Sequence, residues 1–106
     1  MIKFEDFKEI DIRVAEILDV RDHPDADRLY VLTIHNGETE KQIVAGIRSA
    51  YSRDELVGRK IIVIDNLEPA VIRGETSDGM LLAAGSDNGP VLLTPEKEVP
   101  AGSKVR

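Results

Sequence analysis

Three side chains able to bind a metal ion or to exchange protons stand close together in HPDADR, residues 23–28. An imidazole and two carboxylates are common metal ligands and common general acids and bases. A metal site would require His23, Asp25 and Asp27 to converge, which alternate residues of an extended segment need not do. The segment also fits a shaped turn, because Pro24 ends strand pairing and an aspartate can bond to nearby backbone amides. We expect a structural turn.

Other groupings typical of catalysis are missing from the sequence. There is no cysteine, which excludes thiolate metal sites, cysteine nucleophiles and disulfides. The second histidine, His35, lies beside a predicted hairpin turn, away from His23. No Ser/His/Asp order and no glycine loop able to cradle a phosphate is present. The sequence therefore favours a binding protein without a cofactor or a metal over an enzyme.

Composition predicts one small soluble domain. The 106 residues are 42% hydrophobic and 32% charged, which is typical of a globular chain. No apolar run could cross a bilayer and the N-terminal MIKFEDF is acidic, so we expect a cytoplasmic protein. The net charge is −6, but residues 41–73 carry six basic and four acidic side chains. A locally positive region on an acidic body could attract a polyanion to one face.

Hydrophobic periodicity predicts mostly strands. Residues 10–20 alternate with period two and slip near Ala15–Ile17, which indicates a strand with a bend or bulge. The segment at 30–37 alternates and ends on Asn36-Gly37, a pair that suits a tight hairpin turn, and 41–47 follows as the return strand. Ser52 and Glu55 form a capping box that starts a short helix, and Gly58 ends it. Ala15 and Ile17 make one face of this first strand partly apolar. The residues that the pattern places together on the other face are Ile10, Ile12, Val14, Leu18 and Val20.

Two further strands are predicted at 60–65 and 80–85, with a turn between Gly74 and Gly79. Five strands with one short helix between the third and the fourth is the order of an all-β, five-stranded OB-fold barrel. The bend in the first strand agrees with this fold, since that strand must serve both halves of the barrel. Residues after 85 predict an extra hairpin or loop outside the barrel.

The segments DIRVAEILDV, HPDADRLYVLTI, QIVAGIRSAY, ELVGRKIIVIDNLEP and IRGETSDGMLLAAG together resemble the tRNA-binding OB domain family. That family includes the C-terminal domain of methionyl-tRNA synthetases and stand-alone tRNA-binding proteins. The likeness runs from about Phe7 to Gly85, and it is greatest to the free-standing form named the methionyl-tRNA synthetase beta subunit. No aminoacylation motif is present.

The resemblance implies one non-catalytic domain over residues 1–106, with a barrel core at about 7–85. It would bind tRNA by shape and backbone contacts. It would form a homodimer through a C-terminal segment at about 86–106, and methionyl-tRNA synthetase is a possible partner.

The resemblance also indicates which residues would contact tRNA. Arg73 is the favoured phosphate contact, although it could be a solvated arginine. The SxGM motif, Ser77 to Met80, could face a ribose or phosphate, or it could be a glycine turn with a core methionine. Asn66 is expected to be structural. The implied tRNA-binding residues are Arg28, Lys41, Gln42, Arg48, Ser49, Arg73, Ser77, Gly79 and Met80.

One departure from the sequence pattern of this family favours a different function. Relatives usually carry lysine or arginine after the NLxP motif, whereas this chain reads Glu68 to Ile72 without a cation. Fewer phosphate contacts weaken binding and its salt dependence. The alternative is a chaperone or protein-interaction dimer like the CsaA-type secretion chaperones, which share the fold. The HPxAD, NLxP and SxGM motifs favour tRNA binding over the chaperone function.

Overall fold

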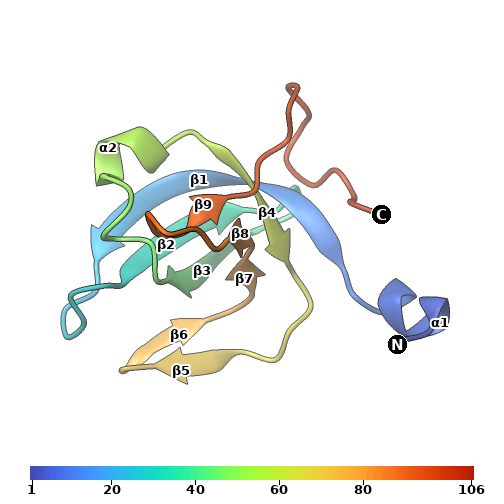
Figure 1. Cartoon of the computed structure of the whole chain (residues 1–106), viewed down its shortest axis with the longest axis horizontal. Helices are drawn as coiled ribbons and strands as arrows, with labels where there is room; N and C mark the ends of the chain where they lie inside the picture. Colours follow the sequence, from blue (N-terminus) through green and yellow to red (C-terminus); the bar gives the residue numbers. More distant parts are fainter.

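The longest strand, β1 (Ile12–Asp22), is the spine of the molecule in the computed structural model, which describes all residues 1–106. Its second half pairs antiparallel with β2 (Tyr30–His35) and its first half with β4 (Lys60–Ile64). With β3 (Glu40–Ala45) beside β2 and β7 (Met80–Leu81) beside β4, the sheet has the order β3-β2-β1-β4-β7. Figure 1 shows this sheet curling into a barrel around β1.

A β-bulge lets β1 serve both halves of the barrel. The register with β2 shifts between Ile17 and Asp19, so Leu18 is the extra residue. Ala15 and Ile17 are fully buried, and the next buried residue is Val20. The predicted bulge is confirmed. The bulge turns Leu18 outward and leaves it 37% exposed.

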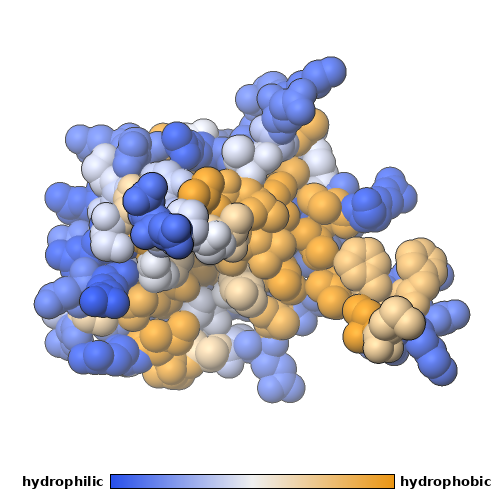
Figure 2. Space-filling model, in the orientation of Figure 1, coloured by the Kyte–Doolittle hydropathy of each residue, from blue (hydrophilic) through white to orange (hydrophobic).

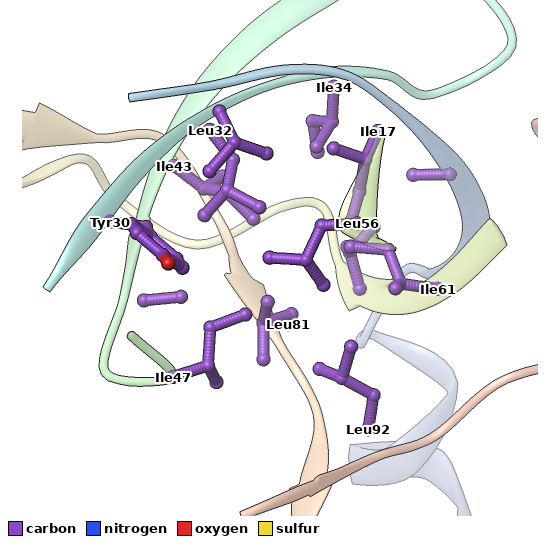
Figure 3. Packing of buried hydrophobic residues seen from close by; sticks show 14 residues of the cluster. Ile17, Tyr30, Leu32, Ile34, Ile43, Ile47, Leu56, Ile61, Leu81 and Leu92 are labelled. Atoms are coloured by element: carbon purple, nitrogen blue, oxygen red, sulfur yellow. The ribbon is translucent and has the colours of Figure 1, made fainter. Parts of the chain in front are cut away.

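The short helix α2 (Arg53–Leu56) closes one end of the barrel (Figure 1). The capping box predicted from the sequence is present: Glu55 accepts a hydrogen bond from the Ser52 amide at 2.7 Å, and the Ser52 hydroxyl accepts one from the Glu55 amide at 3.4 Å. Leu56 is fully buried, and Figure 3 shows it in the middle of the cluster of apolar side chains contributed by the barrel strands. The cap therefore positions a central residue of the core.

Two hairpins extend the barrel. One consists of β5 (Ala70–Ile72) and β6 (Glu75–Ser77) and projects from the bottom of the molecule in Figure 1. The other pairs β8 (Ala83–Ala84) with β9 (Val91–Leu92). The extra hairpin predicted from the sequence is therefore present. It was expected outside the barrel, and this part is wrong, because Leu92 is buried in the same core as the barrel strands.

The two ends of the chain meet beside the start of β1. The helix α1 (Phe4–Lys8) buries none of its residues. The C-terminal residues add to β1: the Val14 amide donates to the Ser103 carbonyl at 2.9 Å, and the Gly102 amide donates to the Val14 carbonyl at 2.7 Å. The last residues therefore belong to the folded barrel. Neither helix reaches the length or the apolar character that a membrane crossing requires.

The expected five-stranded OB-fold barrel, with its helix between the third and the fourth strand, is confirmed. The predicted strand at 10–20 starts later, because Ile10 lies outside β1 and is 39% exposed. The predicted strand at 80–85 is divided at Leu82, whose amide bonds to Ile62 while its carbonyl accepts from Leu93. Helix α1 and the β5–β6 hairpin were not predicted.

Candidate nucleic-acid interface

The β1–β2 loop, residues 23–29, is organised by the ring of His23. This ring is 2% exposed, and its Nδ1 accepts a hydrogen bond from the Asp25 amide at 3.0 Å. Its Nε2 lies 3.0 Å from the Ile72 carbonyl oxygen, which can only accept, so Nε2 carries the proton. The turn is therefore held by the histidine and not by an aspartate side chain as the sequence suggested. Both ring nitrogens are occupied by backbone partners.

The turn of the β5–β6 hairpin lies against this loop. Arg73 and Gly74 form its two-residue turn, and both have positive φ, 52° and 91°. Such turns suit the twist of a hairpin but normally contain glycine or asparagine. The Arg73 guanidinium donates from Nη2 to the Asp25 carbonyl at 2.8 Å. The side chain expected to contact phosphate is therefore anchored to the loop at one nitrogen and exposed elsewhere.

Three of the predicted site residues gather around the same loop. Arg48 lies 3.5 Å from the Ala26 carbonyl through Nη1 and 3.2 Å from the Asp22 carboxylate through Nη2. Arg28 is exposed, and its carbonyl accepts from the Arg48 amide at 3.4 Å. Together with Arg73 they form the loop arginine cluster, defined here as Arg28, Arg48 and Arg73. Ser49, next to Arg48, is exposed.

A second group of predicted residues lies on β3, where the charges are already paired. The Lys41 amine donates to the Asp65 carbonyl at 2.8 Å and lies 3.3 Å from the Asp65 carboxylate and 3.7 Å from that of Asp78. Its side chain is only 16% exposed. Gln42 donates from its side chain to the Thr76 carbonyl at 2.9 Å. Lys41 therefore offers much less free charge to a polyanion than its sequence position suggests.

The SxGM motif closes the barrel. The buried Ser77 hydroxyl accepts from the Val44 amide of β3 and donates to the Gly79 carbonyl, both at 2.9 Å. Gly79 has a φ of 119°, and a Cβ there would lie 2.9 Å from the Ile64 carbonyl oxygen. Met80 is 46% exposed. The motif supplies hydrogen bonds to the free edge of β3, and only its Asp78 and Met80 side chains reach the surface.

An ionic network around Arg13 fixes the start of β1. Arg13 donates to both carboxylate oxygens of Asp11 at 2.8–3.0 Å and to Glu38 at 2.9 Å, and it lies 3.8 Å from Asp65. Its hydrogen bonds, opposed by burial and aided by Lys104, lower the pKa of Asp11 from 3.8 to about 2. The same bonds to Asp11, then to Glu38, raise the pKa of Arg13. The network is structural.

This network predicts a loss of stability in acid. Asp11 has a lower pKa in the folded chain, so its contribution is complete above pH 3.8 and is lost as the pH falls towards 2. We expect the free energy of unfolding in urea to fall over this range. Asp11→Asn should show a weaker pH dependence there than the wild type. Parallel curves for the two proteins would contradict the assignment.

The structure divides the nine predicted residues into three groups, around the β1–β2 loop, on β3 and in the SxGM motif, and adds two features that the sequence did not reveal. The added features are the contact of His23 with Ile72 and the pairing of Lys41 with Asp65. Neither can be found from local patterns, because the partners are far apart in the chain. Asn66 is structural as expected: it accepts from the Asp11 amide at 2.8 Å and donates to the Glu9 carbonyl at 2.7 Å.

The chain is similar to known proteins over almost its whole length. The profile of the family described as "Putative tRNA binding domain" matches residues 12–104. Methionine--tRNA ligase of Thermococcus onnurineus is 49% identical over 105 residues, which are 99% of this chain and 14% of that protein. The CsaA chaperone protein from Picrophilus torridus is 37% identical with a TM-score of 0.93, over 100% of both chains. The MetRS related protein from Pyrococcus horikoshii is 29% identical with a TM-score of 0.91, over 100% of this chain and 98% of that one.

Proposed function

Because the chain belongs to the tRNA-binding domain family, we propose that it binds tRNA through the loop arginine cluster and does no chemistry on it. The observation that carries this proposal is that Arg73 and Arg28 have free charge at the surface. Both are exposed, and neither forms an ion pair within the chain. Guanidinium groups with free donors suit phosphate oxygens, which they can bind in pairs.

The cluster is modest in charge. Asp22 offsets Arg48, and Asp25 and Asp27 lie on the same loop. The segment after the NLxP motif, Glu68 to Ile72, adds no cation, as the sequence indicated. Few phosphate contacts predict weak binding with a shallow dependence on salt. Recognition would then depend on the shape of the tRNA backbone, since the protein has only two tyrosines and two phenylalanines with which to stack bases.

Measuring tRNA affinity across salt concentrations tests the proposal. We expect Arg73→Ala to weaken binding by about tenfold at physiological salt and to lower the slope of log affinity against log salt by about one. Its matched control is Arg53→Ala, which removes the same charge from α2, at the opposite end of the barrel from the β5–β6 hairpin (Figure 1). Equal losses in the two variants would indicate unspecific attraction, and a wild type that does not bind would overturn the proposal.

A binding module of this kind can assist a synthetase. We propose the role of a methionyl-tRNA synthetase beta subunit or trans-acting module in the cytoplasm. The basis is the 49% identity to a segment of a methionine–tRNA ligase. Holding tRNA close to a catalytic partner raises its effective concentration without any new catalytic group.

We also propose a homodimer that forms through the two ends of the chain. Five apolar side chains of α1, the start of β1 and the C-terminal segment line a groove of about 650 Å³. Figure 2 shows hydrophobic side chains continuing from the middle of this face to α1. A five-residue helix without buried residues has little stability of its own. A second copy that packs on α1 would supply what it lacks. The apolar lining residues are Phe4, Phe7, Ile10, Ile12 and Val105.

The mass in solution tests the dimer. Phe4 is 69% exposed, so Phe4→Ser should leave the fold intact and shift sedimentation from the dimer to the monomer. The control is Val57→Ser, which removes a 51% exposed apolar side chain at the C-terminal end of α2. A truncation after Gly85 is a poor test, because it removes the core residue Leu92 together with the C-terminal bonds to β1. A wild-type monomer would contradict the dimer.

Likeness to the Picrophilus torridus CsaA chaperone protein over the full length of both chains favours a second candidate, a chaperone. An exposed apolar groove could hold an unfolded polypeptide, and the net charge of −6 does not favour RNA. The two functions are separated by the same variants. Binding to a reduced, unfolded polypeptide that is unaffected by Arg73→Ala but lost in Phe4→Ser would indicate the chaperone.

A further inference from the structure

We propose that His23 is a positioning residue for tRNA binding: it fixes the turn of the β5–β6 hairpin so that Arg73 presents its guanidinium to a phosphate. The inference rests on the proposed function and deepens it. His23 is buried and lies outside the predicted contacts, so it touches no RNA itself. Its effect would pass through two backbone partners, Ile72 and Asp25.

Three hydrogen bonds form a closed ring between the loop and the hairpin. His23 donates from Nε2 to the Ile72 carbonyl at 3.0 Å, and its Nδ1 accepts from the Asp25 amide at 3.0 Å. The Asp25 carbonyl in turn accepts from Arg73 at 2.8 Å. Since Ile72 and Arg73 are consecutive, the ring fixes both ends of the arginine: its backbone through Ile72 and its guanidinium through Asp25. The bond that holds the backbone next to Arg73 to the β1–β2 loop comes from the His23 side chain.

The backbone of Arg73 explains why it needs such support. It is the only residue other than glycine in the chain with a positive φ. A side chain disfavours this conformation, and strain of this kind persists where the surroundings enforce it, often at functional sites. Glycine would suit the turn without strain. An arginine there is consistent with a need for its side chain, which uses one donor nitrogen on Asp25 and leaves the other donors of the guanidinium free for an anion.

A second contact holds the hairpin but cannot replace the ring. Arg21 of β1 forms an ion pair with Glu75 of β6. This pair is on the strand that leaves the turn, and the Arg21 side chain is 48% exposed. It restrains the hairpin as a whole, whereas the histidine acts on the carbonyl directly before Arg73. Loss of the histidine bond should therefore free the turn without detaching the hairpin.

Two conservative variants separate the two bonds of His23. In His23→Gln the amide nitrogen can occupy the place of Nε2 and donate to Ile72. In His23→Asn the side-chain oxygen can occupy the place of Nδ1 and accept from the Asp25 amide, as in an Asx-turn, but nothing reaches Ile72. We expect His23→Asn to weaken tRNA binding about as much as Arg73→Ala, by about tenfold, and His23→Gln to stay within about threefold of the wild type.

The double variant and a measurement without RNA complete the test. In the Arg73→Ala background, His23→Asn should cause no further loss, because its effect acts through the arginine. Amide hydrogen exchange in the free protein should rise at residues 72–75 in His23→Asn and match the wild type elsewhere, which also reports whether the variant is folded. If wild type binds tRNA and Arg73→Ala weakens binding but His23→Asn does not, or if the two losses add, the positioning role is overturned. Failure of the wild type to bind would instead overturn the proposed function.

Discussion

Replacing Arg13 by methionine should lower the free energy of unfolding by about 3 kcal/mol, because it leaves Asp11 without its main partner and removes a cation beside Asp65. Arg13 is 11% exposed and bonds to Asp11 through two nitrogens. Asp65, whose side chain is 10% exposed, would keep only Lys41 and an amide bond from Asn36 at 2.9 Å. For a chain of this length we expect the midpoint of thermal unfolding to fall by about 15 °C.

The matched control for this variant is Arg21→Met. Arg21 also pairs with one carboxylate, Glu75, but its side chain is 48% exposed. An exposed pair contributes less than about 1 kcal/mol, so the same substitution should have a small effect there. Chemical denaturation of both variants measures the difference. Similar losses in the two would show that the network around Arg13 is no stronger than a surface ion pair, and the structural role of Asp11 and Asp65 would then be wrong.

The barrel could be predicted from the sequence because its strands carry local signals. β2 places Tyr30, Leu32 and Ile34 on one face, β4 is a continuous apolar run, and α2 has a capping box and a terminal glycine. The β5–β6 hairpin has neither kind of signal. Its strands have three residues each, Val71 is 72% exposed, and the turn has arginine where asparagine or glycine is expected. A hairpin of this kind is held by its contacts with the rest of the fold and not by its own sequence.

The candidate site was predicted less fully than the fold, for the same reason. Residue types identified the cations, but their value for binding depends on distant partners. Lys41 and Arg73 both looked available in the sequence. The fold brings Asp65 to Lys41 from 24 positions away and only a backbone carbonyl to Arg73 from 48 positions away. The first cation is neutralised and the second is not. This difference between two similar side chains is set by the topology of the barrel.

Replacing Gly37 by alanine should lower the free energy of unfolding by about 3 kcal/mol and release the C-terminal segment from β1. Gly37 has a φ of 94°, and a Cβ there would lie 2.5 Å from the Gly102 Cα and 2.8 Å from the Ala101 carbonyl oxygen. Both are backbone atoms, so the clash adds to the strain of the positive φ. A displacement of the segment that relieves the clash would break its bonds to Val14.

A second glycine separates the clash from the strain. Gly58 has nearly the same φ, 90°, but a Cβ there meets nothing within 4 Å. Gly58→Ala should therefore lose only about 1 kcal/mol. Hydrogen exchange of the Val14 amide, which donates to the Ser103 carbonyl, should become faster in Gly37→Ala and remain slow in Gly58→Ala. Suppose that the two variants lose equal free energy of unfolding and that the Val14 amide exchanges slowly in both. The hairpin turn and the C-terminal segment would then not stabilise each other. The groove beside α1 would then lack the rigid wall that dimerisation through the C-terminal segment requires.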